Sequence, residues 1–388
     1  MSALIPFLIL IAAGLFFSEI FKKLHLPYVI ALITAGIIIG PVLNLIVVDE
    51  TIALLGSIGI VFLMFIAGSE IKTDIFKEIG KNIFFVAFLN AVIPFSVGVL
   101  IGYLFGFTIY TSLMIGIVFI SSSIAIIIPT LERNYMINTK LGQAIISTTV
   151  IEDVASLFLL AFLLQRYTKQ TPIPLPIYIP VVILLILGLK YFIPRIGKII
   201  FSEKTERDLF QTKLRYLFVV LVANVILFEI LGMHAILAGF VIGIFLGDMI
   251  EGKIESKIRV ISYGFFIPIF FLVIGMRTDI LTLANFSNIF MVVVIVLGLM
   301  ISKIFSGWVG GKILNLSNDE SLLFGVSTTP QLSTTLAAAY VALEFGLLNN
   351  ELITSFVILS LVTVFVTPIL MDVLIKRMPK RDGIDIKT

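Results

Sequence analysis

The sequence predicts an all-α polytopic membrane protein with thirteen transmembrane helices. Of its 388 residues, 59% are hydrophobic and 13% are charged, and the mean hydropathy is +1.16. A soluble globular chain carries about a quarter charged residues. The apolar runs are long and continuous, which excludes an outer-membrane barrel, because barrel strands alternate apolar and polar residues over about ten positions. The chain has no cysteine, so it has neither a disulfide framework nor a thiolate metal site.

Apolar windows of about 20 residues are long enough to cross a bilayer as helices. They predict helices at residues 3–21, 27–47, 51–69, 82–105, 110–131, 139–164, 176–200, 210–231, 233–248, 258–276, 286–314, 321–346 and 351–375. No basic segment precedes the first run, so we expect a retained helix and not a cleaved signal peptide.

Lysine and arginine divide unequally between the two sides that these helices define. The side reached after the first helix holds 22 of the 27, the other side holds three, and Lys190 and Lys303 lie within helices. By the positive-inside rule the richer side is cytoplasmic. We therefore expect a multi-pass protein of the cell membrane with its N-terminus outside and its C-terminus in the cytoplasm. The net charge of +3 is small and gives no sign of nucleic-acid binding.

Thirteen helices divide as six, one and six, and a single connecting helix makes the second six enter the membrane from the opposite side. Such an inverted repeat is common in secondary transporters. The expected parts are a first six-helix repeat at 1–164, a linker helix at 165–209, and a second repeat with a short cytoplasmic tail at 210–388.

The fifth and twelfth helices of this scheme share a polar, proline-containing pattern. The fifth carries Ser121-Ser122-Ser123 with Pro129, and the twelfth carries Ser327-Thr328-Thr329-Pro330-Gln331. A proline inside a helix leaves the carbonyl four residues earlier without its partner, here Ala125 and Val326. Broken helices at matching places in two repeats point to a binding site near the middle of the membrane. Ordinary proline kinks with small residues for packing are the alternative.

Two neighbouring acids, Glu152 and Asp153, lie in the middle of the sixth apolar run. An ionised side chain at the bilayer centre costs about 2.5–3.5 kcal/mol on insertion scales, so such acids indicate a functional site. Thr149 lies one helical turn before Asp153, and Ser156 lies one turn after. These positions predict a hydroxyl-lined sector that holds a proton or a partly dehydrated cation. A structural ion pair between helices is the alternative.

Lys303 is the basic residue near the middle of its apolar run, and a lysine at that depth requires a partner. We expect it to pair with Glu152 or Asp153. Glu70, at the end of the third helix, is expected to be solvated surface. The sequence has no phosphate-binding glycine loop, nucleophile elbow or zinc-ligand histidine pair, so we expect neither an enzyme nor a cofactor.

Four stretches resemble the monovalent cation/proton antiporters, specifically the second cation/proton antiporter family, which contains bacterial and archaeal sodium/proton exchangers. They are Gly68-Ser69-Glu70-Ile71 with Asp74, Ile151-Glu152-Asp153-Val154, residues 231–240 and residues 267–276. The resemblance implies crossed, unwound fifth and twelfth helices in a core domain of residues 82–164 and 286–375. It also implies a dimerisation domain of residues 1–69 and 210–276, and a homodimer.

The same resemblance implies that Asp153 is the ion-binding aspartate and that Lys303 pairs with the position before it. That position departs from the family pattern, because relatives carry aspartate, asparagine or glutamine where this chain has Glu152. The twelfth helix also has Thr329-Pro330-Gln331 where many relatives have a proline-arginine-glycine-glutamate run. The chain ends about a dozen residues after its last predicted helix, which disfavours the potassium efflux type with its nucleotide-binding domain.

The activity that the resemblance implies is exchange of Na+, or of Li+ or K+, against H+ by alternating access. Asp153 and Glu152 are the expected cation and proton site, with the single-ion site at Asp153 and with a Glu152–Lys303 pair that is remade or broken during the cycle. Expected supporting ligands are Ser122, Ser123, Thr149, Ser156 and Thr329, because hard cations prefer oxygen. Open alternatives are a K+/H+ antiporter of the efflux type, a gated cation channel and an organic-anion carrier, although an acid pair would repel an organic anion.

Overall fold

The described part of the chain is helical throughout. The structure, a computed structural model, describes residues 4–23, 27–71, 81–165, 175–201, 212–247, 249–250 and 253–378, and no strand occurs in these ranges. Asp74 and part of the predicted linker region 165–209 lie outside them. Most described residues of the thirteen predicted ranges are helical, but residues 43–47 at the end of the second range are not, and residues 121–123 and 328–332 interrupt the fifth and twelfth ranges. The chain is thus an all-helical, multi-pass membrane protein.

The chain divides into two compact units. Unit 1 comprises Met1–Lys77 and Ala161–Thr278, and unit 2 comprises Glu78–Leu160 and Asp279–Thr388. The helices of unit 1 are α1 (Leu4–Lys23), α2 (Tyr28–Ile37), the π-helical η1 (Ile38–Val42), α3 (Glu50–Ser69), α9 (Leu175–Phe201), α10 (Thr212–Ile230), α11 (Ala235–Gly247), α12 (Lys253–Ile261), the π-helical η2 (Ser262–Phe266) and α13 (Ile267–Arg277). Those of unit 2 are α5 (Lys81–Leu104), α6 (Ile109–Ile120), α7 (Ile124–Arg133), most of α8 (Lys140–Gln165), the 3₁₀ helix η3 (Ile280–Ala284), α14 (Phe286–Ile313), α15 (Asn318–Ser327), α16 (Ser333–Glu344) and α17 (Asn350–Arg377).

Nine helical runs in the described ranges have the length and apolarity of a membrane span. The remaining four predicted spans do not have both the length and the apolarity of a membrane span, each for an identifiable reason. Helices α2 and α11 are apolar but short, α10 carries Lys213, Arg215 and Glu229, and the pair α15 and α16 is interrupted.

Unit 1 is built on close contacts between helices that are distant in sequence. Helix α3 packs against α11 and α13, and α2 packs against α13. Gly36 on α2 permits the last contact, because a β-carbon there would collide with the carbonyl oxygen of Leu272, and Gly275 is equally close to the backbone of α2. Small residues let membrane helices approach in this way.

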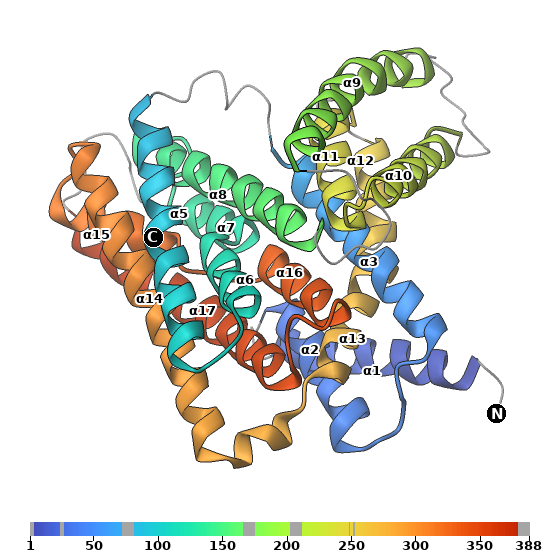
Figure 1. Cartoon of the computed structure of the whole chain (residues 1–388), viewed down its shortest axis with the longest axis horizontal. Coiled ribbons are helices and arrows are strands. Elements are labelled where there is room, and N and C mark those ends of the chain that lie inside the picture. The colour runs from blue at the N-terminus through green and yellow to red at the C-terminus, as the bar shows by residue number, and fades with distance from the viewer. Residues whose placement is uncertain are drawn as a thin grey trace. The chain divides into compact units, whose positions relative to one another are not determined.

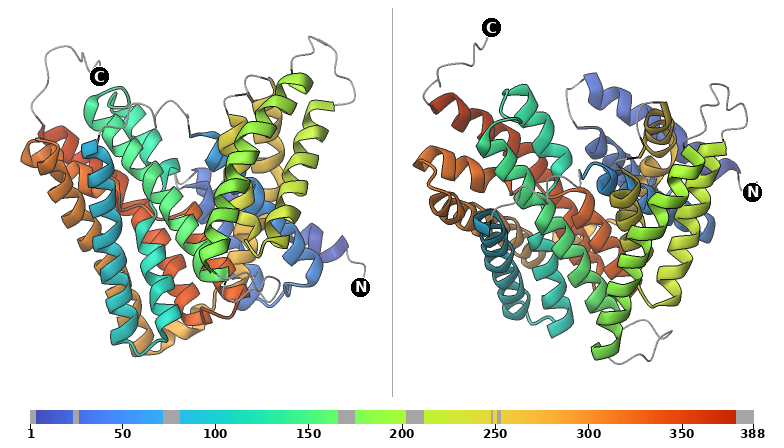
Figure 2. Two further views of the ribbon diagram at one scale, coloured as in Figure 1. Left: turned by 45° about the horizontal axis from the view of Figure 1, so that its top comes forward. Right: turned by 90° about the horizontal axis from the view of Figure 1, so that it is seen from above.

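Unit 2 contains two helices that are broken in the middle. Helices α6 and α7 are separated by residues 121–123, and α15 and α16 by residues 328–332. Half-helix α6 packs against α16, half-helix α7 packs against α17, and α5 packs against α6 and α14, as can be followed in Figures 1 and 2.

The two prolines that predicted helix breaks have different positions relative to the breaks in the structure. Pro129 is inside helix α7, downstream of the break at the three serines, and Pro330 is in the unwound segment itself. The expectation that Pro330 leaves the carbonyl of Val326 free is wrong, because this oxygen accepts from the backbone nitrogen of Thr329 at 3.1 Å and from its hydroxyl at 2.8 Å. The polar residues end helix α15 by bonding to the preceding turn, which such short side chains do readily.

Candidate functional site

The two helix breaks of unit 2 are joined to each other by hydrogen bonds. The backbone N–H of Ser123 donates to the carbonyl of Pro330 at 2.7 Å. In the opposite direction, the side-chain amide of Gln331 donates to the carbonyl of Ser121. The hydroxyls of Ser121 and Thr335 lie within hydrogen-bonding distance of the Gln331 side-chain oxygen. Unwound backbone at membrane depth is tolerated only where its polar groups find such partners.

Next to the breaks, Lys303 of α14 forms an ion pair with Glu152 of α8. The Lys303 Nζ lies 2.7 Å from Glu152 Oε2, and both side chains are 0% exposed. The ammonium also donates to the carbonyl of Ile120 and to the hydroxyl of Ser122, at 2.5 and 3.1 Å. All three N–H groups of the ammonium are therefore used. Of the two partners that the sequence left open for Lys303, Glu152 is the one in contact.

Glu152 has two further donors besides the lysine. The first is the Ser122 hydroxyl, whose one proton is shared between the same oxygen, Oε2, at 2.8 Å and the carbonyl of Thr328 at 2.7 Å. The second is Asn90 of α5, which donates its amide to the other oxygen, Oε1. The Asn90 oxygen in turn accepts from the hydroxyl of Ser306. A buried ion pair persists only when additional hydrogen bonds satisfy its remaining lone pairs, and these bonds do so for Glu152.

Asp153 has a different environment, although it is the next residue. It is 5% exposed and accepts one backbone hydrogen bond, from Ser122 N–H at 3.3 Å, with Thr334 as a side-chain partner. No lysine or arginine bonds directly to this carboxylate in the described part of the chain. A carboxylate can accept about four hydrogen bonds, so Asp153 has oxygen lone pairs free for a proton or a hard cation.

Two of the predicted hydroxyl ligands bond to their own helix. The hydroxyl of Thr149 donates to the carbonyl of Ile145 at 3.0 Å, and that of Ser156 donates to the carbonyl of Asp153 at 2.9 Å. Both residues are buried, but neither hydroxyl makes a hydrogen bond to the Glu152 or Asp153 carboxylate. The helical spacing did not determine their hydrogen-bond partners.

The other predicted hydroxyls lie at the breaks. Thr329 is 2.7 Å from the hydroxyl of Thr367 on α17. Ser123 is buried, and its hydroxyl is without a hydrogen-bond partner among the described residues. Ser122 is therefore the one predicted ligand whose hydroxyl contacts Glu152 and Lys303 directly.

Asn90 and Gln331 are the two buried amides of this site, and neither was predicted as a site residue. Each is fully buried and uses both ends of its amide. Asn90 could have been identified from the sequence, because it is the one amide side chain in the apolar helix α5 after its first turn. Gln331 was recognised only as a departure from the family pattern.

Glu70 of unit 1 is not the solvated group that was expected. It is 27% exposed and its carboxylate lies 3.2 Å from Arg259, which also pairs with Glu255 at 3.0 Å. Burial raises the pKa of Glu70 above its usual value, and Arg259 opposes this shift.

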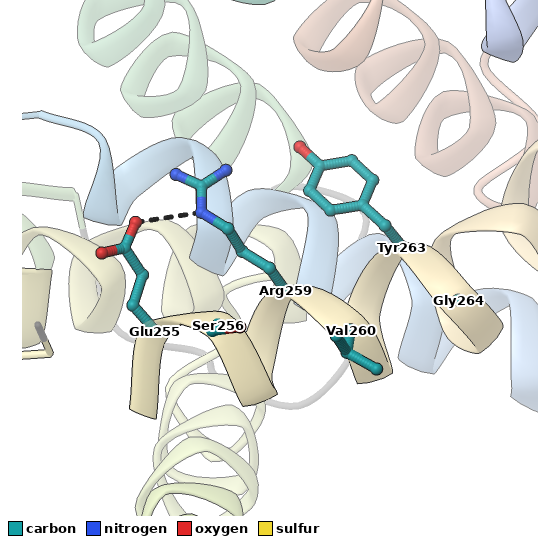
Figure 3. A pocket seen from close by; sticks show the side chains of 6 residues that line it. All are labelled: Glu255, Ser256, Arg259, Val260, Tyr263 and Gly264. Carbon is teal, nitrogen blue, oxygen red and sulfur yellow. Dashed lines mark hydrogen bonds and ion pairs between the residues drawn. The ribbon is translucent and has the colours of Figure 1, made fainter. Parts of the chain in front are cut away.

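Arg259 and Glu255 line a pocket of about 640 Å³ along α12 and η2, together with Ser256, Val260, Tyr263 and Gly264 (Figure 3). Its arginine is paired with two acids, Glu70 and Glu255, so the guanidinium is not free to bind an anion.

The Asp153 carboxylate itself supplies oxygen ligands, which suit a hard monovalent cation. No group of three or more histidine, cysteine, aspartate or glutamate side chains occurs among the described residues. The chemistry available at this site is therefore exchange of a proton or a small cation at a carboxylate held beside a fixed ion pair.

Comparisons with known proteins identify the family of this chain. The family model described as "Sodium/hydrogen exchanger, transmembrane" matches residues 7–376. The chain is 31% identical over 374 residues to the Probable Na(+)/H(+) antiporter 3 of Methanocaldococcus jannaschii, with 94% of each protein covered. It is 23% identical over 377 residues to the Na(+)/H(+) antiporter of Enterococcus hirae, covering 93% of this chain and 94% of that protein.

Among solved structures, the chain is similar to the sodium proton antiporter MjNhaP1 from Methanocaldococcus jannaschii at pH 8. The TM-score is 0.72 at 17% sequence identity, and the match covers 97% of this chain and 99% of that one. At this identity the similarity establishes a common fold.

Proposed function

This chain belongs to the sodium/hydrogen exchanger family, a family of transporters and not of enzymes, and we propose that it exchanges a monovalent cation, Na+ or Li+, for H+ across the cell membrane by alternating access. The observation that carries the proposal is the contrast between the two acids. Glu152 is held at both oxygens by Lys303, Ser122 and Asn90, whereas Asp153 has one backbone donor, Ser122, and one side-chain partner, Thr334, and no cationic partner among the described residues.

Coupling follows from competition at Asp153. A carboxylate that binds a proton loses most of its attraction for a cation, and a bound cation repels the proton. We assume that the site changes its access from one side of the membrane to the other only while Asp153 holds a proton or a cation. Transport of a cation in one direction then requires transport of a proton in the other direction. Glu152 belongs to this site as the charged partner of Lys303.

Oxygen atoms around Asp153 are the proposed supporting ligands. Ser123 has a buried hydroxyl with no hydrogen-bond partner among the described residues, and Ser122 lies against the Asp153 carboxylate through its backbone. Thr149, Ser156 and Thr329 donate their hydroxyl protons elsewhere, which leaves oxygen lone pairs to replace part of a hydration shell.

We assign thirteen membrane spans in two inverted six-helix repeats, with the N-terminus outside and the C-terminus in the cytoplasm. The breaks between α6 and α7 and between α15 and α16 occur in the fifth and twelfth predicted spans, which are corresponding places of the two repeats. The distribution of lysine and arginine supports the orientation.

Unit 2, which holds both breaks and both acids, is the proposed ion-translocating core, corresponding to residues 82–164 and 286–375. Unit 1 is the proposed dimerisation domain of a homodimer, corresponding to residues 1–69 and 210–276. Its support is the division of the chain into units with nearly these boundaries.

The test is cation-driven proton movement in proteoliposomes, with Na+, Li+, K+ and Rb+ added in turn. Wild-type protein should move protons on addition of Na+, and Asp153→Asn should abolish this movement, because the amide neither ionises nor binds a cation strongly. Asp49→Asn is the matched control, since Asp49 caps helix α3 in unit 1 and asparagine caps equally well. Full exchange by Asp153→Asn would contradict the proposal.

The ion series also separates the alternatives. The same oxygens can bind K+, so proton movement with K+ and not with Na+ would favour a K+/H+ antiporter. Cation current that persists without a pH gradient at channel-like rates would favour a gated cation channel.

A further inference from the structure

A buried amide on α5 connects the two helices that carry the ion pair. Asn90 is 0% exposed and lies within the apolar helix α5. Its nitrogen donates to Glu152 Oε1 on α8, and its oxygen accepts from Ser306 on α14. Ser306 is one helical turn after Lys303, so the chain of contacts from Lys303 to Glu152, Asn90 and Ser306 returns to the helix where it began.

We propose that Asn90 is a positioning residue that holds Glu152 in its pair with Lys303, so that Asp153 alone exchanges and one cation moves per proton. The inference rests on the proposed function. The inference goes beyond the proposed function because it specifies the stoichiometry of exchange. It also replaces the expectation that the Glu152–Lys303 pair is remade or broken during the cycle.

The first step of the inference concerns the freedom of Glu152. A glutamate has one more rotatable bond than an aspartate and can swing toward a neighbouring cation unless both oxygens are held. Asn90 engages Oε1, whereas Lys303 and Ser122 engage Oε2. Rotating the carboxylate would leave the Asn90 amide and the Lys303 ammonium without their acceptor in a dry interior. Each buried polar group left unpaired in this way costs free energy.

The second step concerns Lys303. Its three N–H groups are donated to Glu152, Ser122 and the carbonyl of Ile120. Removing a proton from this ammonium would leave an oxygen acceptor without its donor. The pair thus keeps a constant net charge while Asp153 alternates between a proton and a cation.

Charge counting then gives the stoichiometry. The loaded site has the same net charge with Asp153 protonated as with Asp153 bound to Na+, because the neighbouring pair does not change. Each turnover therefore exchanges one cation for one proton and moves no net charge. If Glu152 took part, a second proton could be carried and exchange would respond to the membrane potential.

The measurement is the balance point of exchange in proteoliposomes. Opposing Na+ and pH gradients are imposed until no net proton movement occurs, with the membrane potential clamped at zero and then at a second value. One-for-one exchange predicts that a tenfold Na+ gradient is balanced by a difference of about one pH unit at both potentials. Balance at about half a pH unit, or a balance point that moves with the potential, would overturn the proposal.

The variant Asn90→Leu tests the positioning role, since leucine has a similar volume and no hydrogen-bonding group. We expect the apparent KM for Na+ to change by about tenfold or more, the expected scale for a lost hydrogen bond to a buried charge, and the balance point to become dependent on potential. Asn224→Leu is the matched control. Asn224 is a buried asparagine of α10 whose amide nitrogen bonds to the backbone of its own helix, and its replacement should leave both quantities unchanged.

Ser306→Ala keeps the proposal testable if Asn90→Leu does not fold. It removes only the donor to the Asn90 oxygen, and it should shift the KM for Na+ in the same direction as Asn90→Leu by a smaller factor. An unchanged KM in Ser306→Ala, or in a folded Asn90→Leu, would overturn the positioning role. If wild-type protein moves no protons with any cation, the proposed function itself fails. If it exchanges two protons per cation, the proposed function stands and this inference fails.

Discussion

Removal of the lysine from the buried pair should destabilise unit 2 strongly. Lys303→Met keeps most of the side-chain volume and deletes the ammonium that donates to Glu152 at 2.7 Å and to Ser122 at 3.1 Å. Both members of the pair are 0% exposed, so the variant leaves Glu152 charged and uncompensated inside the protein. Breaking a buried pair in this way costs about 3–5 kcal/mol.

This free energy can be converted to a melting temperature. For a domain of 150–250 residues, a range that includes unit 2, 1 kcal/mol shifts Tm by about 2–4 °C. Lys303→Met should therefore lower Tm by about 6–20 °C, measured by thermal unfolding of the purified protein in detergent. The difference from wild type should narrow as the pH falls, because Glu152 can then be neutralised by a proton.

Two further variants make the result interpretable. Arg133→Met removes an arginine that is 62% exposed and pairs with Asp372 on α17. Exposed pairs contribute about 0–1 kcal/mol, so its Tm should fall by at most about 4 °C. The double variant Lys303→Met/Glu152→Gln should recover more than half of the loss, because no uncompensated charge remains. A loss for Lys303→Met no larger than that for Arg133→Met would refute the reasoning.

Two further predictions concern Gln331, which joins the two helix breaks, and Glu70, which pairs with Arg259 in unit 1. Gln331→Ala should raise the apparent KM for the cation by about tenfold in the proteoliposome assay, because the carbonyl of Ser121 loses its donor at a cost of about 1–3 kcal/mol; an unchanged KM would contradict a role for this bridge. Burial raises the pKa of Glu70 above 4.5, so the stability that this group contributes is present at acidic pH and is lost as the pH rises through the raised value. The Tm of wild type should therefore fall relative to Glu70→Gln as the pH increases from below 4.5 toward neutral, and parallel Tm curves would show that Glu70 is not shifted.

The positions of the helices could be predicted from the sequence because burial in lipid leaves long apolar runs. The breaks could be located only approximately. An average over 20 residues does not detect three unwound serines at 121–123, and Pro129, which suggested a kink, is accommodated within helix α7. Thr329 satisfies the Val326 carbonyl that Pro330 was expected to leave open, so the unwinding depends on local competition for backbone hydrogen bonds.

The charged part of the candidate site could be predicted for the same reason. Glu152, Asp153 and Lys303 are conspicuous because an ionised group in an apolar run is costly. Hydroxyl and amide partners were harder to assign. Thr149 bonds to its own helix, and Asn90 reaches Glu152 from a helix 62 residues away in sequence. Helical periodicity gives the face of one helix and does not say which face of another helix lies against it.

Competition between cation and proton at Asp153 can be measured directly as proton release on cation binding. Purified wild-type protein in weakly buffered detergent solution, with no membrane and no gradient, should release protons when Na+ is added at a pH where Asp153 is protonated. Asp153→Asn should release none. Proton release by Asp153→Asn equal to that of wild type would show that the two ions do not share this carboxylate.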